Sequence, residues 1–223
     1  GLKSINDRLG HAEGDAAIVS MGEALRNTFR SADTIARMGG DEFVVILTGL
    51  ADSDVPVMLQ RLRRAFLRQG FARETGIEVG EGNPLLDDVI GFAVAVRRLL
   101  LAALARAGSG SPRLLAHFHE WLGGAALLLL ASERRRLSSV FTTHATSVGR
   151  YIASSGGDLY ESLSRLDGEA EAARFGILPQ HRIECACARA CDVFTTVSPI
   201  TGEECQRLLG RSPDRITPNG LNI

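Results

Sequence analysis

Apolar side chains along the first third of the chain follow two different periods. They recur at near-helical spacing over residues 10–30 and again over 52–68. Between these stretches, residues 34–38 and 43–47 are rich in strand-forming side chains, and a Gly-Gly turn signal separates them. The pattern therefore predicts two helices on either side of a β-hairpin whose tip is the Gly-Gly-Asp-Glu segment at 39–42.

The remaining two thirds of the chain show a different pattern of apolar residues. Residues 69–84 contain four glycines and a proline and are the best candidate for a junction, and a Gly-Ser-rich break follows at 108–112. Short apolar runs then alternate with helical patterns, which predicts a parallel sheet with helices on its faces. The predicted strands are 114–119, 139–143, 193–197 and 215–217, and the predicted helices are 85–106, 122–135, 168–191 and 199–209.

Composition and charge argue against several classes of protein. The chain has 223 residues, of which 45% are hydrophobic and 23% charged, and this balance is typical of a globular protein and not of a disordered one. The formal net charge of −1 provides no electrostatic footprint for nucleic acid or for an anionic membrane. The longest apolar stretch, 89–105, carries Arg97 and Arg98 at its centre, which disfavours a membrane span.

We therefore expect a cytoplasmic protein without nucleic-acid or membrane partners. The chain opens on Gly-Leu-Lys with no early apolar run, so we expect no signal peptide, and because position 1 is not methionine we also expect that this is not a natural start. The cysteines lack the paired spacing of structural zinc sites, and we expect small buried thiols rather than a metal site. They are Cys185, Cys187, Cys191 and Cys205.

The hairpin tip carries the first candidate chemistry. A tight glycine turn lets phosphate approach the backbone, and Asp41 and Glu42 beside it could hold Mg²⁺, although adjacent acids at a turn are also common as solvated residues. Together with its neighbours, the tip resembles the diguanylate cyclase (GGDEF) family over residues 1–68. The matching strings are Lys3-Ser4-Ile5-Asn6-Asp7, Gly10-His11, Gly14-Asp15, Arg30-x-x-Asp33 and Arg37-Met38-Gly39-Gly40-Asp41-Glu42-Phe43.

This resemblance implies a partial GGDEF domain with a nucleotidyl-cyclase-like α+β fold that joins two GTP into cyclic di-GMP. The chain departs from the family pattern, since the metal-binding Asp of the first strand and the strands after residue 68 are missing, so we expect this part to be nearly inert. The implied residues are Asn6 and Asp15 for guanine, Asp41 and Glu42 for Mg²⁺ and phosphate, and Arg30 and Asp33 for inhibitory cyclic di-GMP.

The second candidate chemistry lies where two predicted strands end. In parallel α/β sheets, ligands bind at the carboxyl ends of the strands. His119-Glu120 and His144 follow such strands, and imidazole and carboxylate groups can hydrogen-bond sugar hydroxyls. From about residue 74 the chain resembles the glycogen synthases of glycosyltransferase family 3. The matching strings are Thr75-Gly76-Ile77-Glu78-Val79, Ala116-His117-Phe118-His119-Glu120-Trp121, Val140-Phe141-Thr142-Thr143-His144-Ala145-Thr146, Gly149-Arg150-Tyr151, Val193-Phe194-Thr195-Thr196-Val197-Ser198 and Thr217-Pro218-Asn219-Gly220-Leu221-Asn222.

This second resemblance implies a hexosyltransferase of the GT-B type that transfers glucose from UDP-glucose to a growing α-1,4-glucan such as glycogen, without a cofactor. It implies that His144 contacts the glucosyl unit, that Glu120 orients a sugar and that Arg150 lies near the donor phosphates. His119 would line the same sugar site, and Asn219 would line a cleft between two domains. Away from this site, we expect His117 and Trp121 to be core residues and His181 to be structural or solvated.

Taken together, these patterns predict an α/β chain in three parts. We expect a partial GGDEF-like domain at 1–68, a junction at 69–84 and a partial Rossmann-like domain of a glycogen synthase at 85–223. The family's Gly-rich nucleotide loop and its catalytic second domain fall outside the matched strings, so we expect neither glucosyl transfer nor cyclic di-GMP synthesis from the chain as written. The alternatives are a partial diguanylate cyclase or a fusion module that binds cyclic di-GMP. Because both parts are truncated, we expect a fragmentary chimera more than a natural fusion of whole domains.

Overall fold

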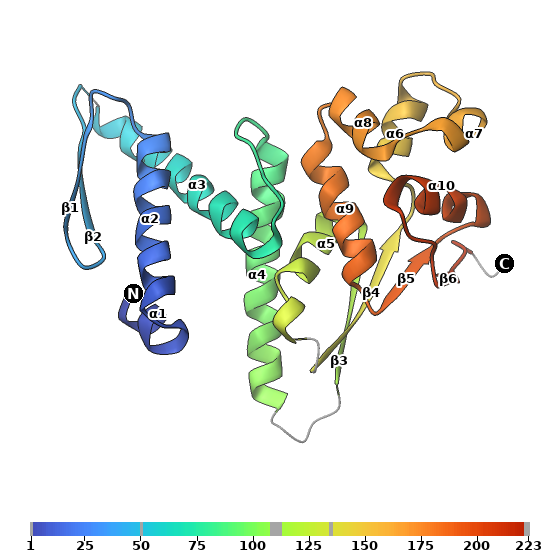
Figure 1. Cartoon of the computed structure of the whole chain (residues 1–223), viewed down its shortest axis with the longest axis horizontal. Helices are drawn as coiled ribbons and strands as arrows, with labels where there is room; N and C mark the ends of the chain where they lie inside the picture. The colour runs from blue at the N-terminus through green and yellow to red at the C-terminus, as the bar shows by residue number, and fades with distance from the viewer. Residues whose placement is uncertain (1, 50, 108–112, 134–135, 221–223) are drawn as a thin grey trace. The chain divides into compact units, whose positions relative to one another are not determined.

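The computed structural model describes residues 2–49, 51–107, 113–133 and 136–220 (Figure 1). The chain divides into two compact units, Gly1–Gly70 and Phe71–Ile223, and each is described by itself. The glycine- and serine-rich break predicted at 108–112 lies outside the described residues. Among the residues described, no helix has the length and apolar character needed to cross a bilayer.

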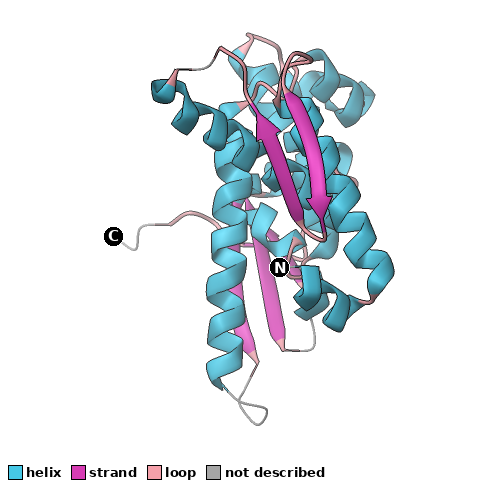
Figure 2. Ribbon diagram, turned by 90° about the vertical axis from the view of Figure 1, so that its left-hand side faces the viewer, coloured by secondary structure: helices cyan, strands magenta, loops and turns pink. Residues whose placement is uncertain are grey.

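The first unit contains the predicted helix and hairpin. The two hairpin strands, magenta in Figure 2, pair antiparallel with Thr34 opposite Ile46, and the turn between them falls at Gly40 and Asp41. A short N-terminal helix precedes them and was not predicted, because eight residues carry too few turns to display a clear period. The elements are α1 (Leu2–Leu9), α2 (His11–Thr28), β1 (Thr34–Gly39), β2 (Glu42–Ile46) and the 3₁₀ turn η1 (Asp52–Asp54).

Helix α3 (Val55–Thr75) is longer than the sequence pattern predicts, since it continues past Arg68. Gly70 lies inside the helix, where a glycine costs only about 1 kcal/mol relative to alanine. The helix ends at Gly76, which has a φ of +71° and donates its N–H to the carbonyl of Ala72 at 2.7 Å. A left-handed glycine of this kind is a common helix terminator.

The second unit is built on a parallel sheet, as predicted. Its strand order is β3-β4-β5-β6, and all three neighbouring pairs are parallel. The α/β class and the Rossmann-like parallel sheet are therefore confirmed, and the hairpin forms a separate antiparallel sheet. The strands are β3 (Leu114–His119), β4 (Leu137–Thr143), β5 (Val193–Thr196) and β6 (Arg215–Ile216).

Helices cover one face of this sheet. A Cβ added at Gly124 of α5 would lie 2.8 Å from the ring of Phe141, and a Cβ at Gly202 of α10 would lie 3.9 Å from the side chain of Thr196. Because side chains alternate along a strand, the buried rings of Phe118, Phe141 and Phe194 point to this same face. The helices of the unit are α4 (Pro84–Ala107), α5 (Glu120–Leu128), α6 (Ser147–Ser154), α7 (Leu159–Ser162), α8 (Gly168–Arg174), α9 (Leu178–Ala190) and α10 (Pro199–Leu209).

Two predicted helices differ from those in the structure. The pattern at 168–191 is divided into α8 and α9, because Gly176 adopts a φ of +70° and Pro179 lies in the first turn of the second helix. The helix predicted at 122–135 begins at Glu120 and ends at Leu128, and a 3₁₀ turn (Ala131–Glu133) follows it.

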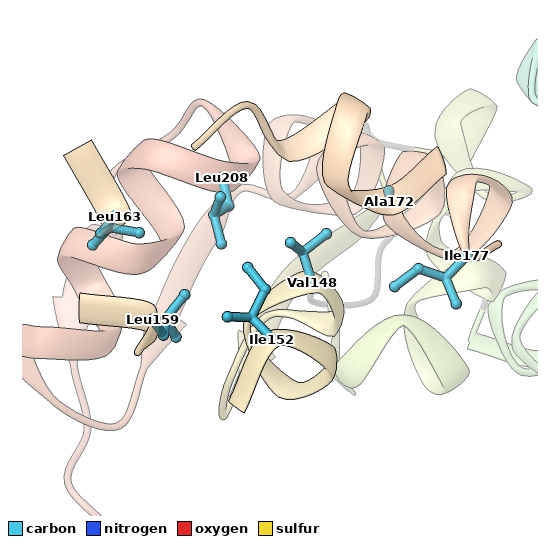
Figure 3. Packing of buried hydrophobic residues seen from close by; sticks show 7 residues of the cluster. All are labelled: Val148, Ile152, Leu159, Leu163, Ala172, Ile177 and Leu208. Atoms are coloured by element: carbon cyan, nitrogen blue, oxygen red, sulfur yellow. The ribbon is translucent and has the colours of Figure 1, made fainter. Parts of the chain in front are cut away.

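A cluster of buried apolar side chains packs α6 against the helices that follow it in the chain (Figure 3). Val148 and Ile152 of α6 contribute to it, so the start of α6 is anchored by buried side chains. This anchor fixes one end of the loop that carries His144. The remaining labelled members of the cluster are Leu159, Leu163, Ala172, Ile177 and Leu208.

Candidate sugar-binding site

The carboxyl ends of β3 and β4 bring two histidines together. His119 is the last residue of β3, and His144 immediately follows β4. Because these strands are parallel neighbours, their ends meet at one edge of the sheet. Nδ1 of His119 lies 3.2 Å from Nε2 of His144, and the two rings are stacked with centroids 5.5 Å apart.

Glu120 connects this pair to a cation. Its Oε1 accepts hydrogen bonds from the backbone N–H of His144 at 3.0 Å and from Nη2 of Arg150 at 2.8 Å. The Glu120 side chain is 21% exposed and that of Arg150 is 55% exposed, so the carboxylate is partly shielded from solvent while the guanidinium that it binds is accessible. We call these four residues, His119, Glu120, His144 and Arg150, the sugar-edge cluster.

The backbone of Glu120 is strained. Its φ is +56°, and it is the one non-glycine residue with positive φ in the described part of the chain. A side chain in this left-handed region costs about 1–2 kcal/mol. Strain of this kind often accompanies functional sites, and here it occurs at the residue that bonds both His144 and Arg150.

Behind the cluster, two buried carboxylates hold the loop that carries His144. Glu184 of α9 accepts a hydrogen bond from the hydroxyl of Thr143 at 3.0 Å and one from the N–H of Ser147 at 2.9 Å. Glu204 of α10 accepts from the N–H of Thr146 at 2.7 Å and from its hydroxyl at 2.5 Å. The loop between β4 and α6 is therefore tied to two helices as well as to the sheet.

Burial dominates the ionisation of both carboxyl groups. It raises the pKa of Glu184 to about 7, although the hydrogen bonds from Ser147 and Thr143 oppose this. It also raises the pKa of Glu204, against the two hydrogen bonds from Thr146. Sequence reasoning missed both residues. The signal available for Glu184 was its position on the apolar face of α9, in line with Cys187 and three or four residues from other buried positions.

His117 does not lie in the core, contrary to expectation. It is exposed, its Nε2 lies 2.7 Å from the hydroxyl of Thr142, and its ring centroid is 4.2 Å from that of His119. Partial burial lowers its pKa, and the neighbouring imidazoles of His119 and His144 lower it further. The prediction was wrong because His117 shares the face of β3 that carries His119, and the helices cover the opposite face.

Three other sequence predictions have clear placements. Trp121 is half-buried at the start of α5. His181 is buried, in agreement with a structural role, and its Nε2 lies 3.5 Å from the Sγ of Cys185, while burial lowers its pKa. Asn219 lies in the exposed segment after β6, and no hydrogen bond connects it with the sugar-edge cluster among the residues described.

In the first unit, Asp41 and Glu42 lie at the hairpin tip as predicted. Oδ2 of Asp41 accepts the backbone N–H of Leu2 at 3.0 Å, and this hydrogen bond holds the pKa of Asp41 below its usual value. Asp41 also lines a cavity of about 330 Å³ between the hairpin and the first two helices. Carboxylate oxygens suit Mg²⁺, but across the described ranges no group of three or more potential ligands converges on one point.

The other residues predicted for this unit are engaged in local structure. Asp33 accepts the backbone N–H groups of Arg30 at 2.9 Å and Thr48 at 3.4 Å, so its carboxylate supports the chain around the turn. Asn6 packs against α2, where a Cβ added at Gly14 would lie 1.8 Å from its Oδ1. That oxygen is buried and has no hydrogen-bond partner within the described residues, whereas Asp15 is exposed.

The cysteines are free and buried, as expected from the sequence. Burial is the first cause that raises the pKa of each thiol, and Cys185 reaches about 12. Thiols in such surroundings stay neutral and behave as small apolar side chains.

Comparison with protein families identifies two regions of similarity. The family model described as "Glycogen synthase" matches residues 66–223, and the one described as "Diguanylate cyclase, GGDEF domain" matches residues 1–79. Both resemblances drawn from the sequence are confirmed by these matches. The two matched regions overlap over 66–79, which includes the end of α3.

Several curated glycogen synthases resemble part of the chain. The chain is 52% identical over 111 residues to glycogen [starch] synthase isoform 2 of Saccharomyces cerevisiae, covering 49% of the chain and 16% of that relative. It is 50% identical over 109 residues to glycogen [starch] synthase of Neurospora crassa, covering 49% and 15%. The Caenorhabditis elegans protein of the same name is 42% identical over 135 residues, covering 60% and 20%. The matched segments thus span between 15% and 20% of the length of these relatives.

Proposed function

The chain belongs to the glycogen synthase family, and from this we propose that its parallel-sheet unit binds the glucosyl end of UDP-glucose or of an α-1,4-glucan. The observation that carries the proposal is the sugar-edge cluster, where two imidazoles, a carboxylate and a guanidinium meet at the ends of β3 and β4. Such groups supply donors and acceptors for sugar hydroxyls and a cation for phosphate. The family reaction, glucosyl transfer from UDP-glucose to glycogen by a GT-B enzyme, is proposed for the whole protein to which this unit corresponds.

Each member of the cluster has a proposed part in binding. His144 and His119 present ring nitrogens to sugar hydroxyls, and Arg150, whose side chain is 55% exposed while paired with Glu120, presents its remaining N–H groups to the donor diphosphate. Glu120 holds both His144 and Arg150 while its other oxygen remains an acceptor for a hydroxyl. Asn219 is proposed to approach the ligand from the exposed segment after β6. No cofactor is proposed for this site.

Saturation-transfer NMR with UDP-glucose, UDP and maltose tests this binding. The 223-residue polypeptide is expected to show transfer to the glucosyl protons, and His144→Ala is expected to abolish it. His11→Ala, which changes an exposed histidine of α2, is the control and leaves the signal intact. Transfer that persists in His144→Ala, or that is absent for all three ligands in the parent protein, would contradict the proposal.

We also expect binding without turnover. Within the described residues, the sugar-edge cluster holds a single arginine and no second cation that could clamp a diphosphate. Incubation of the polypeptide with radiolabelled UDP-glucose and glycogen is therefore expected to leave the glycogen unlabelled. Incorporation of label would show that this expectation is wrong while leaving the binding proposal in place.

A second candidate function concerns the first unit, and the match of residues 1–79 to the GGDEF family favours it. We propose that the cavity beside Asp41 accepts a guanine nucleotide, GTP, with Mg²⁺ held by Asp41 and Glu42, where the metal would neutralise phosphate charge. Asn6 and Asp15 would contact the base. Cyclic di-GMP binding at Arg30 and Asp33 is the alternative, in which the ligand would share Asp33 with the two backbone N–H groups that its carboxylate already accepts.

Calorimetry distinguishes these two forms of the second proposal. GTP with Mg²⁺ is expected to release heat that Asp41→Asn removes, whereas cyclic di-GMP is expected to release none. Heat from cyclic di-GMP that Arg30→Ala removes would favour the alternative. Synthesis of cyclic di-GMP is not expected in either form of the proposal.

A cytoplasmic location is proposed with these functions, because the four free thiols suit a reducing compartment.

A further inference from the structure

Three glutamates from three helices share the loop that presents His144. Glu120 of α5 accepts the N–H of His144, Glu184 of α9 accepts from Thr143 and Ser147, and Glu204 of α10 accepts from Thr146. Apart from Arg150, which donates to Glu120 from within α6, every donor named for these glutamates lies between the last residue of β4 and the first residue of α6. The loop conformation therefore depends on acceptors supplied by distant parts of the chain.

The hydroxyl of Thr143 connects the buried glutamate to the site. It lies 3.0 Å from Oε1 of Glu184, 3.2 Å from the carbonyl of Ala145 and 3.4 Å from Oε2 of Glu120. A hydroxyl has one proton, so it can donate fully to only one of these three oxygens. The ionised form of Glu184 is the strongest of the three acceptors because of its short distance and its charge.

We propose that Glu184 is a positioning residue for His144, because its protonation redirects the Thr143 hydroxyl from Glu184 to Glu120. When Glu184 takes a proton from solvent, its new O–H donates to Oγ1 of Thr143, and the Thr143 proton turns to Oε2 of Glu120. Glu120 then shares its charge with a further donor and holds His144 and Arg150 less strongly. This inference deepens the proposed function, because the effect of Glu184 on sugar binding follows only if the sugar-edge cluster binds sugar as proposed.

The surroundings of Glu184 leave few other charges that could produce the same effect. Of the groups that face it, Glu120 on α5 raises its pKa, and the thiols of Cys185 and Cys187 on α9 and of Cys205 on α10 are neutral because burial raises their pKa. Glu204 is the buried acid of α10, and its charge raises the pKa of Cys205. Since the pKa of Glu184 is about 7, the redirection would occur in the neutral range.

Carboxyl ¹³C NMR of the full chain tests the proposal without any ligand. We expect the Glu184 Cδ signal to titrate with a midpoint near pH 7 and the Glu120 Cδ signal to show an inflection at the same midpoint. Glu184→Gln and Thr143→Val are each expected to abolish that Glu120 inflection. Thr143→Ser, which keeps the hydroxyl, is expected to restore it, and Thr195→Val is the matched control on the neighbouring strand that retains it.

The outcomes separate the two proposals. A Glu120 inflection that survives Thr143→Val, or that is absent from the parent protein, would overturn the positioning role. If the inflection behaves as expected but UDP-glucose and maltose do not bind, only the proposed function fails. Far-UV circular dichroism establishes that each variant is folded, and Thr143→Val serves as the test if Glu184→Gln unfolds.

Discussion

The backbone N–H of His144 donates to Oε1 of Glu120 at 3.0 Å, so the residue that follows β4 is held by the residue that follows β3. The same oxygen accepts from Arg150, so one carboxylate oxygen holds the backbone of His144 and the guanidinium of Arg150. Glu120 holds this position in a left-handed backbone conformation that few side chains adopt. The positions of the His144 backbone and of the Arg150 side chain therefore both depend on Glu120.

Replacing Glu120 with alanine is expected to weaken binding of UDP-glucose by about a hundredfold or more, because the two charge-assisted hydrogen bonds lost are together worth about 3–6 kcal/mol. Glu120→Gln keeps an acceptor oxygen, and its affinity for UDP-glucose is expected to lie between that of the parent protein and that of Glu120→Ala. Isothermal titration calorimetry measures the affinity. Glu203→Ala, at an exposed position of α10, is the control. Equal losses in Glu120→Ala and Glu203→Ala would contradict a specific role for Glu120.

Removing the charge of Arg150 is expected to weaken binding of the diphosphate group without changing binding of the sugar. Arg150→Met should weaken binding of UDP-glucose and UDP severalfold and leave binding of maltose unchanged, since maltose carries no phosphate. Arg174→Met is the matched control, because Arg174 is also an exposed arginine paired with a glutamate. Parallel titrations with the three ligands supply the measurement. A loss of maltose binding in Arg150→Met would indicate that Arg150 supports the loop rather than the phosphates.

Much of the sheet was predictable because its strands are short apolar runs with clear limits. The predicted strand 114–119 coincides with β3, and the pattern at 199–209 coincides with α10. The division between α8 and α9 was not predictable, because the helical period continues across Gly176 and only the backbone conformation of that residue interrupts it. Propensity alone assigns such a glycine a modest cost in a helix.

The candidate site was predictable in its exposed part and not in its buried part. His119, Glu120 and His144 follow strands, and the topology of parallel sheets brings them to one edge. Glu184 and Glu204 could not be assigned from sequence, because an acid in a helical pattern is usually solvated. Their burial depends on which helix faces pack against the loop after β4, and that is a property of the tertiary structure.

The raised pKa of Glu184 predicts a specific dependence of stability on pH. The folded state holds this proton more tightly than the unfolded state, so the stability that the group contributes is fully present below pH 4.5 and is lost as pH rises through about 7. Glu184→Gln removes this loss. The difference in unfolding free energy between the variant and the parent should therefore shift in favour of the variant between pH 5 and pH 8, by on the order of 3 kcal/mol.

Urea unfolding followed by the fluorescence of Trp121, the single tryptophan, measures this shift in the second unit. Burial raises the pKa of Glu204 and lowers that of His181, but both groups are present in the two proteins, so their effects cancel in the comparison. A difference between variant and parent that is the same at pH 5 and pH 8 would show that Glu184 does not titrate in this range.

The first unit is expected to be cut by proteases before the second. Its hairpin is a two-stranded sheet, which is marginally stable in isolation, and it exposes Met38, Val44 and Ile46 at 70%, 42% and 57%. Limited trypsin digestion followed by mass spectrometry should release peptides from residues 1–70 while 136–220 stays intact. First cleavage within 136–220 would contradict this order.

Two adjacent glycines of α5 offer a sharp test of the packing behind the site. A Cβ at Gly124 would lie 2.8 Å from both the Sγ of Cys187 and the ring of Phe141, so Gly124→Ala overpacks the contact between α5, α9 and β4. We expect it to destabilise the second unit by about 1–3 kcal/mol. A Cβ at Gly123 would meet no atom within 4 Å, and Gly123→Ala should instead stabilise the helix by up to about 1 kcal/mol.

The two variants differ by one position in the same helix, so their propensity effects are matched and the difference between them reports on packing alone. Urea unfolding monitored by Trp121 fluorescence measures both. Because α5 begins at Glu120, a shift of this helix by overpacking should also displace the carboxylate that holds His144, and Gly124→Ala should lose UDP-glucose affinity where Gly123→Ala does not. Equal stability of the two variants would mean that α5 does not approach β4 as closely as the structure shows.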